Sequence, residues 1–566
     1  MKKNITLFFF LVSIFSISIS ARTLTINLGA SVGKDVTKLL RTQLSQLSPS
    51  DQAIITLSKK GNYYLSGTVE AKCNIAISGT GDKSKFILCN GTDIGEFKAF
   101  TDDSFLEFIG TKEHPITVDI HNISIDLQEH KGFWWLNNPD GSRNEKCAIK
   151  IYHANKVMIS NVNSTLKNAF CTTFNLRVCS NINFSNCKLT NYNNCSGGGI
   201  IWIEGATSNV NITNNVLNKY GNDEALGIYG SHQEINNGQI TFGNTSKKNI
   251  HVSGNIFNYG YNGKDKTKVM NDVLISLFSN GYENGYACTM EDLEFSDNRF
   301  NISDPMRITL QFKIDTPDTY NRLLVQNNTF LNTTENSGGE QFYKTDIKIT
   351  DKSNFSRQPS IEISNNSFVN ESAVLTQWGS TGLSHIQLAG GNVLFSGNTT
   401  NDEQAQEHKK GGILAYITAG SILNLEDNNA KGLAMIGCIS DAGGVDNVVI
   451  NASNNLFEGI TTIYSDKVQQ IDVNFTNNTF RSDNMNFFLQ EFAKEGTVVF
   501  NHNNVTVKGG GGELMTHWAN TNTMNMRFHN LEVIGNSFFG VDNAQKMLIN
   551  MQNVRQKTIR NNSFSK

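Results

Sequence analysis

The sequence has little of several features that mark large classes of proteins. Its 566 residues contain only 6 prolines, and no apolar run beyond residue 21 approaches the ~18 to 20 residues of a membrane-spanning helix. Lysine and arginine total 48 against 51 aspartates and glutamates, a formal net charge of -3. So weak a field does not attract nucleic acid or an anionic membrane. We therefore expect no nucleic-acid partner and no membrane span.

Motifs of the common metal and phosphate sites are also missing. No Cys-x-x-Cys pair occurs, which argues against a zinc site. There is no Asp-rich calcium loop of the EF-hand type, and the glycine run at 509–512 lacks the Lys-Ser/Thr of a phosphate-binding loop. We expect no cofactor and no resident metal, with bound Ca²⁺ an option only for a lyase.

The cysteines are few and irregular in number. There are 9 of them, and an odd count argues against a fully paired disulfide framework in an exported chain. Cys147, Cys171 and Cys195 follow one another at intervals of 24, with Cys179 and Cys187 between them. This spacing predicts one position of a repeating fold that holds stacked, buried thiols.

Residues 1–21 have the three parts of a secretory signal peptide. A basic start, Met-Lys-Lys-Asn, precedes an apolar stretch and a small-residue exit that ends at Ala21. No cysteine lies near the expected cleavage point to accept a lipid. We expect residues 22–566 to be exported to the periplasm, the medium or the cell surface.

One short sequence pattern, which we call the repeat phrase, recurs through the rest of the chain. This part of the chain is rich in Asn, Ser, Thr and Gly. An alternating strand is followed by a polar pair, usually ending in Asn, and then by an apolar residue, as at 210–217, 250–257, 361–368 and 473–480. The spacings between copies run from 23 to 43 residues. The aligned Asn, Gly or Asp positions are 161, 186, 214, 254, 297, 327, 365, 397, 428, 454, 477, 503, 535 and 561.

Short strands at this interval, without helical segments between them, predict a parallel solenoid. Each coil of such a fold can bury its apolar face only against its neighbours. The recurring Asn fits, because Asn tolerates left-handed backbone and its side chain can bond to the next coil. We expect one all-β domain over residues 22–566, with inserted loops where the spacing reaches 40 and 43.

The repeat and the segment before it resemble a known superfamily. That segment contains Asp35-Val-Thr-Lys-Leu-Leu-Arg, then Gly61-Asn-Tyr-Tyr-Leu-Ser-Gly, then Asn74-Ile-Ala-Ile-Ser-Gly-Thr-Gly. It is similar to the start of the pectate-lyase-like superfamily of right-handed parallel β-helix proteins. The resemblance covers roughly residues 24–566 and implies a short helix that caps the N-terminal end. It does not imply one reaction, because the superfamily includes lyases, hydrolases, epimerases, depolymerases and non-catalytic adhesins.

Alternation within four successive coils separates a core face from an outer face. The residues expected to point inward are Ile149, Ile151, Phe174, Leu176, Ile201, Ile203, Leu226 and Ile228. The residues expected to point outward are Lys150, Tyr152, Asn175, Arg177, Trp202, Glu204 and Tyr229, with Asp223 and Glu224 at a strand entry and His232 beyond it. Coils stack ~4.8 Å apart, so the outward set would form one polar and aromatic stripe suited to a saccharide chain.

Within this stripe Asp223 and Glu224 resemble the paired acids of β-helix glycosidases. Hydrolysis needs two carboxyls about 5 to 9.5 Å apart, and Glu204 on the preceding coil is a further candidate for the second one. We therefore assign Asp223, Glu224 and Glu204 as catalytic candidates. Lys150, Tyr152, Arg177, Trp202, Tyr229 and His232 are the substrate-binding candidates.

Two other functions remain open at this point. A lyase acting on a uronate polymer would use the cations of the stripe, with its carboxylates as Ca²⁺ ligands; the cations and bases for it are Lys150, His153, Arg177 and His232. A non-catalytic carbohydrate-binding or adhesive β-helix would need the repeat alone. The Phe133-Trp-Trp segment is a weaker candidate for a sugar-stacking wall, and His517-Trp518 and Gln377-Trp378 are read mainly as packing.

Overall fold

The chain is described by a computed structural model that is almost entirely β-strand. The described residues are 21–89, 104–127, 146–167, 171–193, 199–221, 224–229, 233–236, 239–242, 246–260, 271–278, 289–304, 306–314, 322–334, 344–351, 361–371, 383–402, 413–432, 434–439, 445–459, 461–466, 468–482, 485–490, 495–507, 512–516, 528–540 and 554–565.

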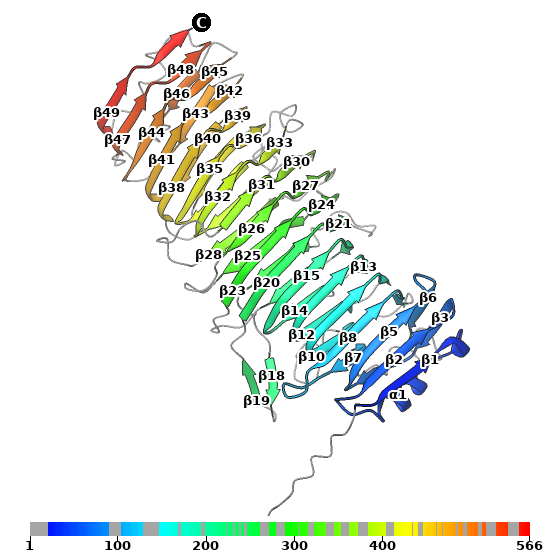
Figure 1. The fold of residues 1–566 in the computed structure, drawn as a ribbon. Coiled ribbons are helices and arrows are strands. Elements are labelled where there is room, and N and C mark those ends of the chain that lie inside the picture. The colour runs from blue at the N-terminus through cyan, green and yellow to red at the C-terminus, as the bar shows by residue number, and fades with distance from the viewer. Residues whose placement is uncertain are drawn as a thin grey trace, which may run out of the picture.

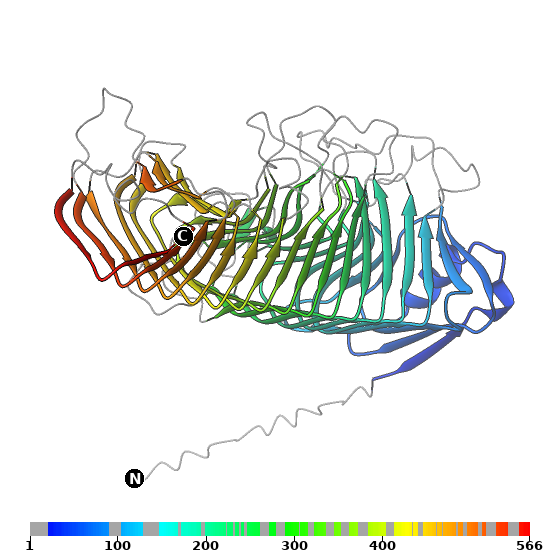
Figure 2. The ribbon, with the colours of Figure 1, turned by 90° about the horizontal axis from the view of Figure 1, so that it is seen from above.

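Each coil of the chain contributes three strands, and each strand pairs in parallel with its counterpart in the next coil. For example, β28 (Lys344–Asp351) pairs with β31 (Leu383–Ala389), β29 (Ile361–Ser364) with β32 (Asn392–Ser396), and β30 (Ser367–Asn370) with β33 (Thr399–Asn401). The coils follow one another along one long axis (Figures 1 and 2). The expected all-β parallel β-helix is therefore confirmed.

We call the three stacks of strands the first, second and third faces. Besides β28 and β31, the first face contains β4 (Val69–Ala71), β7 (Ser104–Ile109), β14 (Ile201–Glu204), β17 (Leu226–Tyr229), β22 (Asn271–Phe278), β25 (Met306–Ile314), β34 (Ile413–Ala419), β37 (Ala434–Ile439), β40 (Thr461–Asp466), β43 (Met485–Gln490) and β46 (Gly512–Thr516). Two long strands, β10 (Lys146–Ser160) and β12 (Cys171–Ser185), belong to both the first and the second face.

Besides β29 and β32, the second face contains β1 (Thr23–Asn27), β2 (Gln52–Leu57), β5 (Asn74–Gly79), β8 (Ile116–His121), β15 (Thr207–Thr213), β20 (Ser246–Ser253), β23 (Thr289–Ser296), β26 (Leu323–Gln326), β35 (Ser421–Glu426), β38 (Val445–Ser453), β41 (Val468–Thr476), β44 (Glu495–Asn501), β47 (Phe528–Ile534) and β49 (Val554–Arg560).

Besides β30 and β33, the third face contains β3 (Gly61–Leu65), β6 (Ser84–Leu88), β9 (Ser124–Leu127), β11 (Asn163–Lys167), β13 (Lys188–Asn193), β16 (Val216–Gly221), β21 (Ile256–Gly260), β24 (Arg299–Ile302), β27 (Thr329–Asn332), β36 (Asn429–Lys431), β39 (Leu456–Glu458), β42 (Thr479–Ser482), β45 (Asn504–Val507), β48 (Ser537–Phe539) and β50 (Ser563–Ser565). A separate antiparallel hairpin joins β18 (Gln233–Asn236) to β19 (Gln239–Phe242).

A short helix covers the N-terminal end, as the resemblance implied (Figure 1). Helix α1 (Thr37–Leu44) buries Leu40 and Leu44, and the Asp35 carboxylate accepts a hydrogen bond of 2.8 Å from the backbone N–H of Thr37. Capping of this kind satisfies a donor that the helix itself cannot pair. No helix in the described part of the chain is long and apolar enough to cross a membrane.

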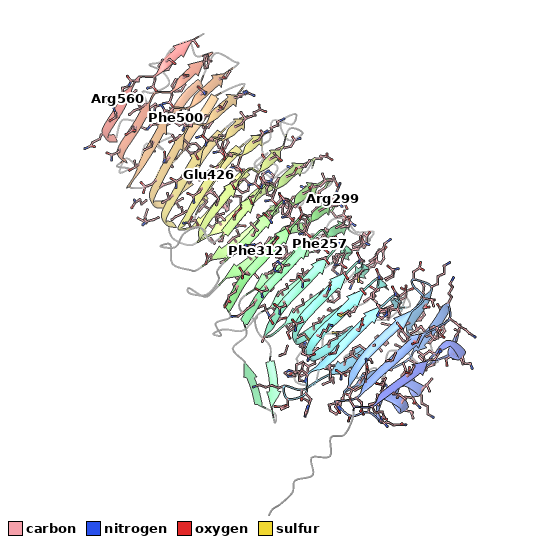
Figure 3. The ribbon with its side chains drawn as sticks, viewed as in Figure 1. Phe257, Arg299, Phe312, Glu426, Phe500 and Arg560 are labelled. Atoms are coloured by element: carbon pink, nitrogen blue, oxygen red, sulfur yellow. The ribbon has the colours of Figure 1, made fainter. Side chains whose placement is uncertain are left out.

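The apolar residue that closes each repeat phrase fills the interior. Phe257, Phe300, Phe330 and Phe368 stack from coil to coil with ring centroids 5.2, 4.7 and 4.8 Å apart. Figure 3 labels Phe257, Phe312 and Phe500, each of them fully buried inside the solenoid. Because each ring contacts the rings of neighbouring coils, burial of the apolar face is shared along the axis.

The polar pair of each phrase divides into two structural positions. The first residue is left-handed, as at Asn327 (φ 56) and Asn365 (φ 56). The second is a buried Asn whose Oδ1 accepts hydrogen bonds from the preceding rung, as when Asn328 Nδ2 donates to Asn366 Oδ1 at 2.9 Å. The rungs of this ladder are Asn215, Asn255, Asn298, Asn328, Asn366, Asn398, Asn428, Asn455, Asn478, Asn503, Asn536 and Asn562.

The sequence alignment was wrong by one residue at two copies. It equated positions 428 and 503 with the left-handed residues, whereas the left-handed residues there are Asp427 (φ 55) and His502 (φ 55). Asp and His occupy this exposed position in place of the usual Asn. The motif pattern, which looks for Asn, therefore selects the ladder Asn one residue later. The expected Asn ladder itself is confirmed.

The cysteine spacing is not a structural period. Cys147 lies opposite Thr172, and Cys171 lies opposite Lys146, because the coil that separates them advances by 25 residues rather than 24. Cys195 lies outside the described residues. Cys73, Cys89, Cys147, Cys179 and Cys187 are buried. Burial raises the pKa of the Cys179 thiol to about 12 and that of Cys187 to about 11, so both are unreactive thiols at neutral pH.

Candidate functional site

The outward residues predicted from the sequence lie in register on the first face. Lys150, Asn175, Trp202, Gly227 and Ser276 form one row across β10, β12, β14, β17 and β22. Tyr152, Arg177, Glu204 and Tyr229 form a second row two residues further along the same strands. All eight residues expected to point inward are fully buried. The inward set is therefore confirmed, whereas Asn175, Trp202 and Tyr229 of the outward set are buried as well.

Glu224 lies on the outer face just before β17, where two hydroxyl groups hold its carboxylate. Tyr229 donates a hydrogen bond to Glu224 Oε1 at 2.7 Å, and Ser276 Oγ donates to the same oxygen at 3.0 Å. Only 9% of Glu224 is exposed. The carboxylate is thus fixed in orientation and shielded from water, which strengthens its interactions.

Two glycines let aromatic rings lie flat along this face. A Cβ atom on Gly227 would come within 2.6 Å of the Tyr229 ring, which folds back over Gly227 to reach Glu224. A Cβ atom on Gly199 would come within 2.1 Å of Trp202 Nε1. The Trp202 and Tyr229 rings meet edge to face with centroids 6.0 Å apart. The glycines therefore set the positions of both rings, because any other residue would displace them.

Two nitrogen donors on this face have no acceptor in the described structure. Trp202 Nε1 and Asn175 Nδ2 are buried and make no hydrogen bond, although Asn175 Oδ1 accepts one from Arg177 Nε at 3.1 Å. Asn175 and Trp202 are direct neighbours in register. Buried N–H groups are normally paired, so two adjacent unpaired donors are exceptional.

The charged residues of the stripe are paired with one another. Arg177 Nε lies 2.6 Å from Glu204 Oε2, and Lys150 Nζ lies 3.2 Å from Glu107 Oε1 on β7. The side chains of Arg177 and Lys150 are 31% and 18% exposed, so both cations lie partly in solvent. Each cation is therefore compensated by a carboxylate.

Glu204 and Glu224 have different surroundings. Glu204 ends β14 and lies opposite Tyr229, five residues after Glu224, which is a backbone separation of up to about 16 Å at ~3.3 Å per residue. Glu204 pairs with Arg177, whereas Glu224 is held by Tyr229 and Ser276. The two glutamates therefore have different ion-pair and hydrogen-bond partners.

Several of the predicted residues lie outside the described part of the chain. These are Asp223, His232, Phe133-Trp-Trp, Gln377-Trp378 and His517-Trp518. His153 is described, with left-handed backbone (φ 50) and its ring 4.3 Å from that of Tyr152. Among the described residues, no group of three or more His, Cys, Asp or Glu could hold a metal ion.

Ser276 and Glu107 belong to this site although the sequence prediction did not select them. Ser276 follows Ile275, which lies opposite Leu226, but 48 residues separate the two in sequence. The alternating run at 271–276 was the available signal. Glu107 lies on β7, opposite Lys150, in a coil that precedes the four coils used for the prediction.

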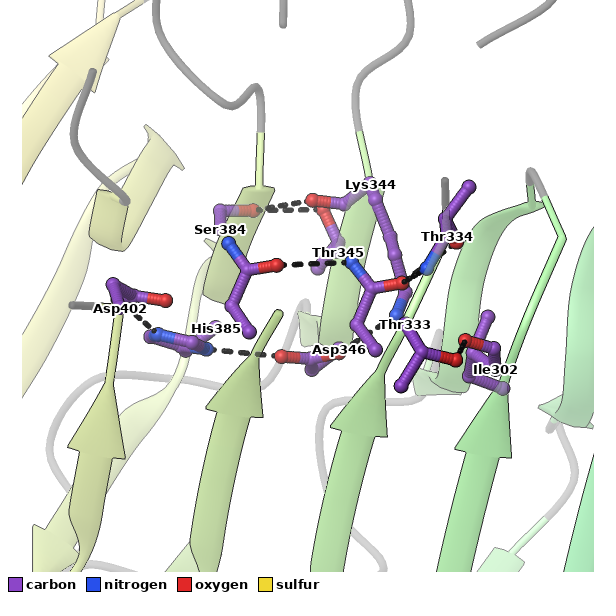
Figure 4. A network of polar contacts seen from close by, with 11 residues as sticks. Ile302, Thr333, Thr334, Lys344, Thr345, Asp346, Ser384, His385 and Asp402 are labelled. Carbon is purple, nitrogen blue, oxygen red and sulfur yellow. Dashed lines mark hydrogen bonds and ion pairs between the residues drawn. The ribbon is translucent and has the colours of Figure 1, made fainter. Parts of the chain in front are cut away.

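A second polar cluster, which the sequence did not reveal, lies in the interior between the first and third faces (Figure 4). His385 bonds to Asp346 Oδ2 through Nδ1 and to Asp402 Oδ2 through Nε2, both at 2.9 Å, and Lys344 Nζ lies 3.4 Å from Asp346 Oδ1. All four side chains are at least 96% buried. Two carboxylates thus face two cationic groups in a dry core, an arrangement typical of structural ion clusters.

Electrostatics in this cluster favours the imidazolium form of His385. Burial by itself lowers the pKa of His385, but Asp402 and Asp346 outweigh it and raise the pKa to about 10. Burial lowers the pKa of Lys344 below its ordinary value, against the opposing attraction of Asp346. Because no part of the cluster is open to solvent, we assign it to stability rather than to catalysis.

No protein-family model and no curated protein sequence matches this chain. Among solved structures, the chain is similar to the DFA-IIIase of Arthrobacter chlorophenolicus A6, crystallised in complex with DFA-III. The sequence identity is 9% and the TM-score is 0.35, with 76% of this chain and 95% of that chain covered. A likeness at this level transfers neither activity nor site residues.

Proposed function

We propose that the protein is an exported, carbohydrate-active β-helix enzyme that cleaves a polysaccharide or glycan on the outer face of β12, β14, β17 and β22. The observation that carries the proposal is the buried carboxylate of Glu224, held by Tyr229 and Ser276 next to Trp202. Export is inferred from the signal-peptide pattern of residues 1–21.

Hydrolysis is the reaction that this arrangement supports best. A carboxyl group fixed in a water-poor setting can transfer a proton or stabilise positive charge at the anomeric carbon. Tyr229 and Ser276 orient the carboxyl by holding Oε1, and Trp202 packs edge to face against the Tyr229 ring. We assign Glu224 as one of the two catalytic carboxyls and the neighbouring Asp223 as the other, with Glu204 kept in position by Arg177.

Elimination on a uronate polymer is less well supported by the described residues. A lyase needs a cation to neutralise the uronate carboxylate and a base to remove the C5 proton. The two described cations of the stripe, Lys150 and Arg177, already face Glu107 and Glu204. A site built for elimination would need a further cation beside the uronate carboxylate.

A polysaccharide panel with two readouts distinguishes the reactions. Wild type and Asp223→Asn are incubated with neutral and acidic polysaccharides, and reducing ends and the absorbance of unsaturated uronates are both measured. Reducing ends without unsaturated products, lost in Asp223→Asn, support hydrolysis by a carboxyl pair. Unsaturated products would identify a lyase, and the absence of any product from the whole panel would leave only a binding function.

A further inference from the structure

We propose that this site accepts a neutral saccharide, whose oxygen atoms receive hydrogen bonds from Trp202 Nε1 and Asn175 Nδ2. The inference rests on the proposed function and specifies its substrate class. The two donor atoms are buried and have no acceptor in the described structure. Their residues are adjacent in register on the outer face.

Unpaired donors of this kind are suited to a ligand that carries oxygen acceptors. A buried N–H without a partner is unfavourable. A ligand that supplies two oxygen acceptors would therefore form two hydrogen bonds that the ligand-free protein lacks. Both donors are neutral, and neutral N–H groups pair well with hydroxyl and ring oxygens. The Glu224 carboxylate, a few residues away on the next strand, accepts hydrogen bonds from hydroxyl donors, as it does from Tyr229. Donors and acceptor together match a polyhydroxylated molecule.

The described charges on the face disfavour an acidic sugar. Glu107, Glu204 and Glu224 give three carboxylates among the described residues of the face, against the two cations Lys150 and Arg177. A uronate carboxylate placed here would meet a net negative surface without an uncompensated cation among the described residues. Like charges in a water-poor site repel strongly, whereas a neutral sugar is unaffected.

The partly exposed row gives the saccharide a way in. Tyr152, Arg177 and Glu204 keep part of their side chains in solvent, whereas Asn175 and Trp202, in the neighbouring row, are fully or nearly fully buried. A sugar ring that stacks on Tyr152 would lie two residues along the strands from the row that contains the two donors.

The test compares binding and cleavage by matched variants. Trp202→Phe keeps an aromatic ring but loses the donor, and Asn175→Asp keeps the oxygen that accepts from Arg177 but loses the amide donor. Tyr416→Phe is the control, because Tyr416 occupies the same row of the first face several coils away. The probes are neutral oligosaccharides of glucan, mannan, galactan, xylan and fructan, and the acidic oligogalacturonates and alginate oligomers, measured by calorimetry and by product release.

We expect the active or bound probe to be neutral, and each donor variant to weaken its binding about tenfold while Tyr416→Phe binds as wild type. Cleavage of only the acidic probes, dependent on Glu224, would overturn this inference and leave an enzyme in place. Unchanged binding of the neutral probe by both donor variants would also overturn it. If no probe is bound or cleaved, the proposed function fails first, and the substrate assignment fails with it.

Discussion

Glu224 receives hydrogen bonds from hydroxyl groups on two different coils, Tyr229 on its own coil and Ser276 on the next. Such bonds to a carboxylate are stronger than those between neutral groups and restrict its rotation. The contacts that fix such a polar side chain therefore form only when neighbouring coils stack. The same holds for His385, whose two aspartates come from different coils.

The Tyr229 hydroxyl should affect catalysis more than stability. Tyr229→Phe removes one hydrogen bond to Glu224 but keeps the ring over Gly227. We expect the cleavage rate to fall about tenfold, or roughly 1.4 kcal/mol in the barrier, with a loss of stability near 1 kcal/mol. Steady-state kinetics on the cleaved polysaccharide measure kcat and KM separately. An unchanged kcat would show that the Tyr229 contact does not position the carboxyl.

His385 should make stability depend on alkaline pH. Its folded pKa of about 10 lies above the ordinary 6.5, so protonated His385 stabilises the fold fully below pH 6.5, and this contribution is lost as the pH rises to about 10. The slope is at most about 1.4 kcal/mol per pH unit. Urea unfolding of wild type and His385→Gln between pH 7 and 10 should show the difference in unfolding free energy narrowing with pH. A constant difference would contradict a charged His385.

The elements of the solenoid are short strands whose register is fixed by two consecutive turn residues. A left-handed residue turns the chain, and the buried Asn after it bonds to the coils on either side, as Asn366 does to Asn328 and Asn398. The turn residue is replaceable by Gly, Asp or His, whereas the rung must be an amide to both donate and accept. The turn position therefore accepts several residue types, whereas the rung position accepts only an amide side chain.

Adjacent substitutions should separate these two positions. Asn366→Ala removes the acceptor of the Asn328 backbone N–H and one of the side-chain hydrogen bonds of each neighbouring rung, so we expect a loss of about 2 to 4 kcal/mol in unfolding free energy. Asn365→Gly keeps the left-handed turn and should change stability by less than about 0.5 kcal/mol. Chemical denaturation measures both variants. Equal effects would refute the division into a turn and a rung.

Gly227 should be as important to the site as Tyr229. Gly227→Ala places a methyl group within 2.6 Å of the Tyr229 ring and forces it away from Glu224. We expect a rate loss similar to that of Tyr229→Phe, and a loss of stability of about 1 to 3 kcal/mol from overpacking. In the double variant the rate losses should not add, because both changes break one contact. Additive rate losses would indicate independent roles.

Features that depend on neighbouring residues in the sequence could be predicted, whereas contacts between residues far apart in the sequence could not. The strands, the buried face and the two rows that contain Trp202 and Arg177 follow from local alternation, so they were predicted. The Tyr229–Glu224 contact depends on a ring folding back over Gly227, which no pattern encodes. Ser276 and the His385 cluster were missed because long insertions separate their partners in sequence, although the coils bring them together.

At the scale of the whole molecule the protein is a long stack in which each coil contacts its two neighbours (Figure 2). The Asn ladder and the Phe stacks run from coil to coil, so stability is approximately a sum over coils and their interfaces. The candidate site occupies the outer face of a few consecutive coils, and the His385 cluster lies in later coils. Damage to one region should therefore leave the chemistry or packing of the other largely intact.

The most direct test of the central claim is the rate of product release by Glu224→Gln on the polysaccharide that wild type cleaves. The matched control is Glu371→Gln, a substitution of an exposed glutamate that follows β30. With melting temperatures of all three proteins measured in parallel, we predict that Glu224→Gln loses at least about a hundredfold in rate, whereas Glu371→Gln cleaves as wild type does. A folded Glu224→Gln protein that cleaves at the wild-type rate would contradict the assignment of the active site to this face.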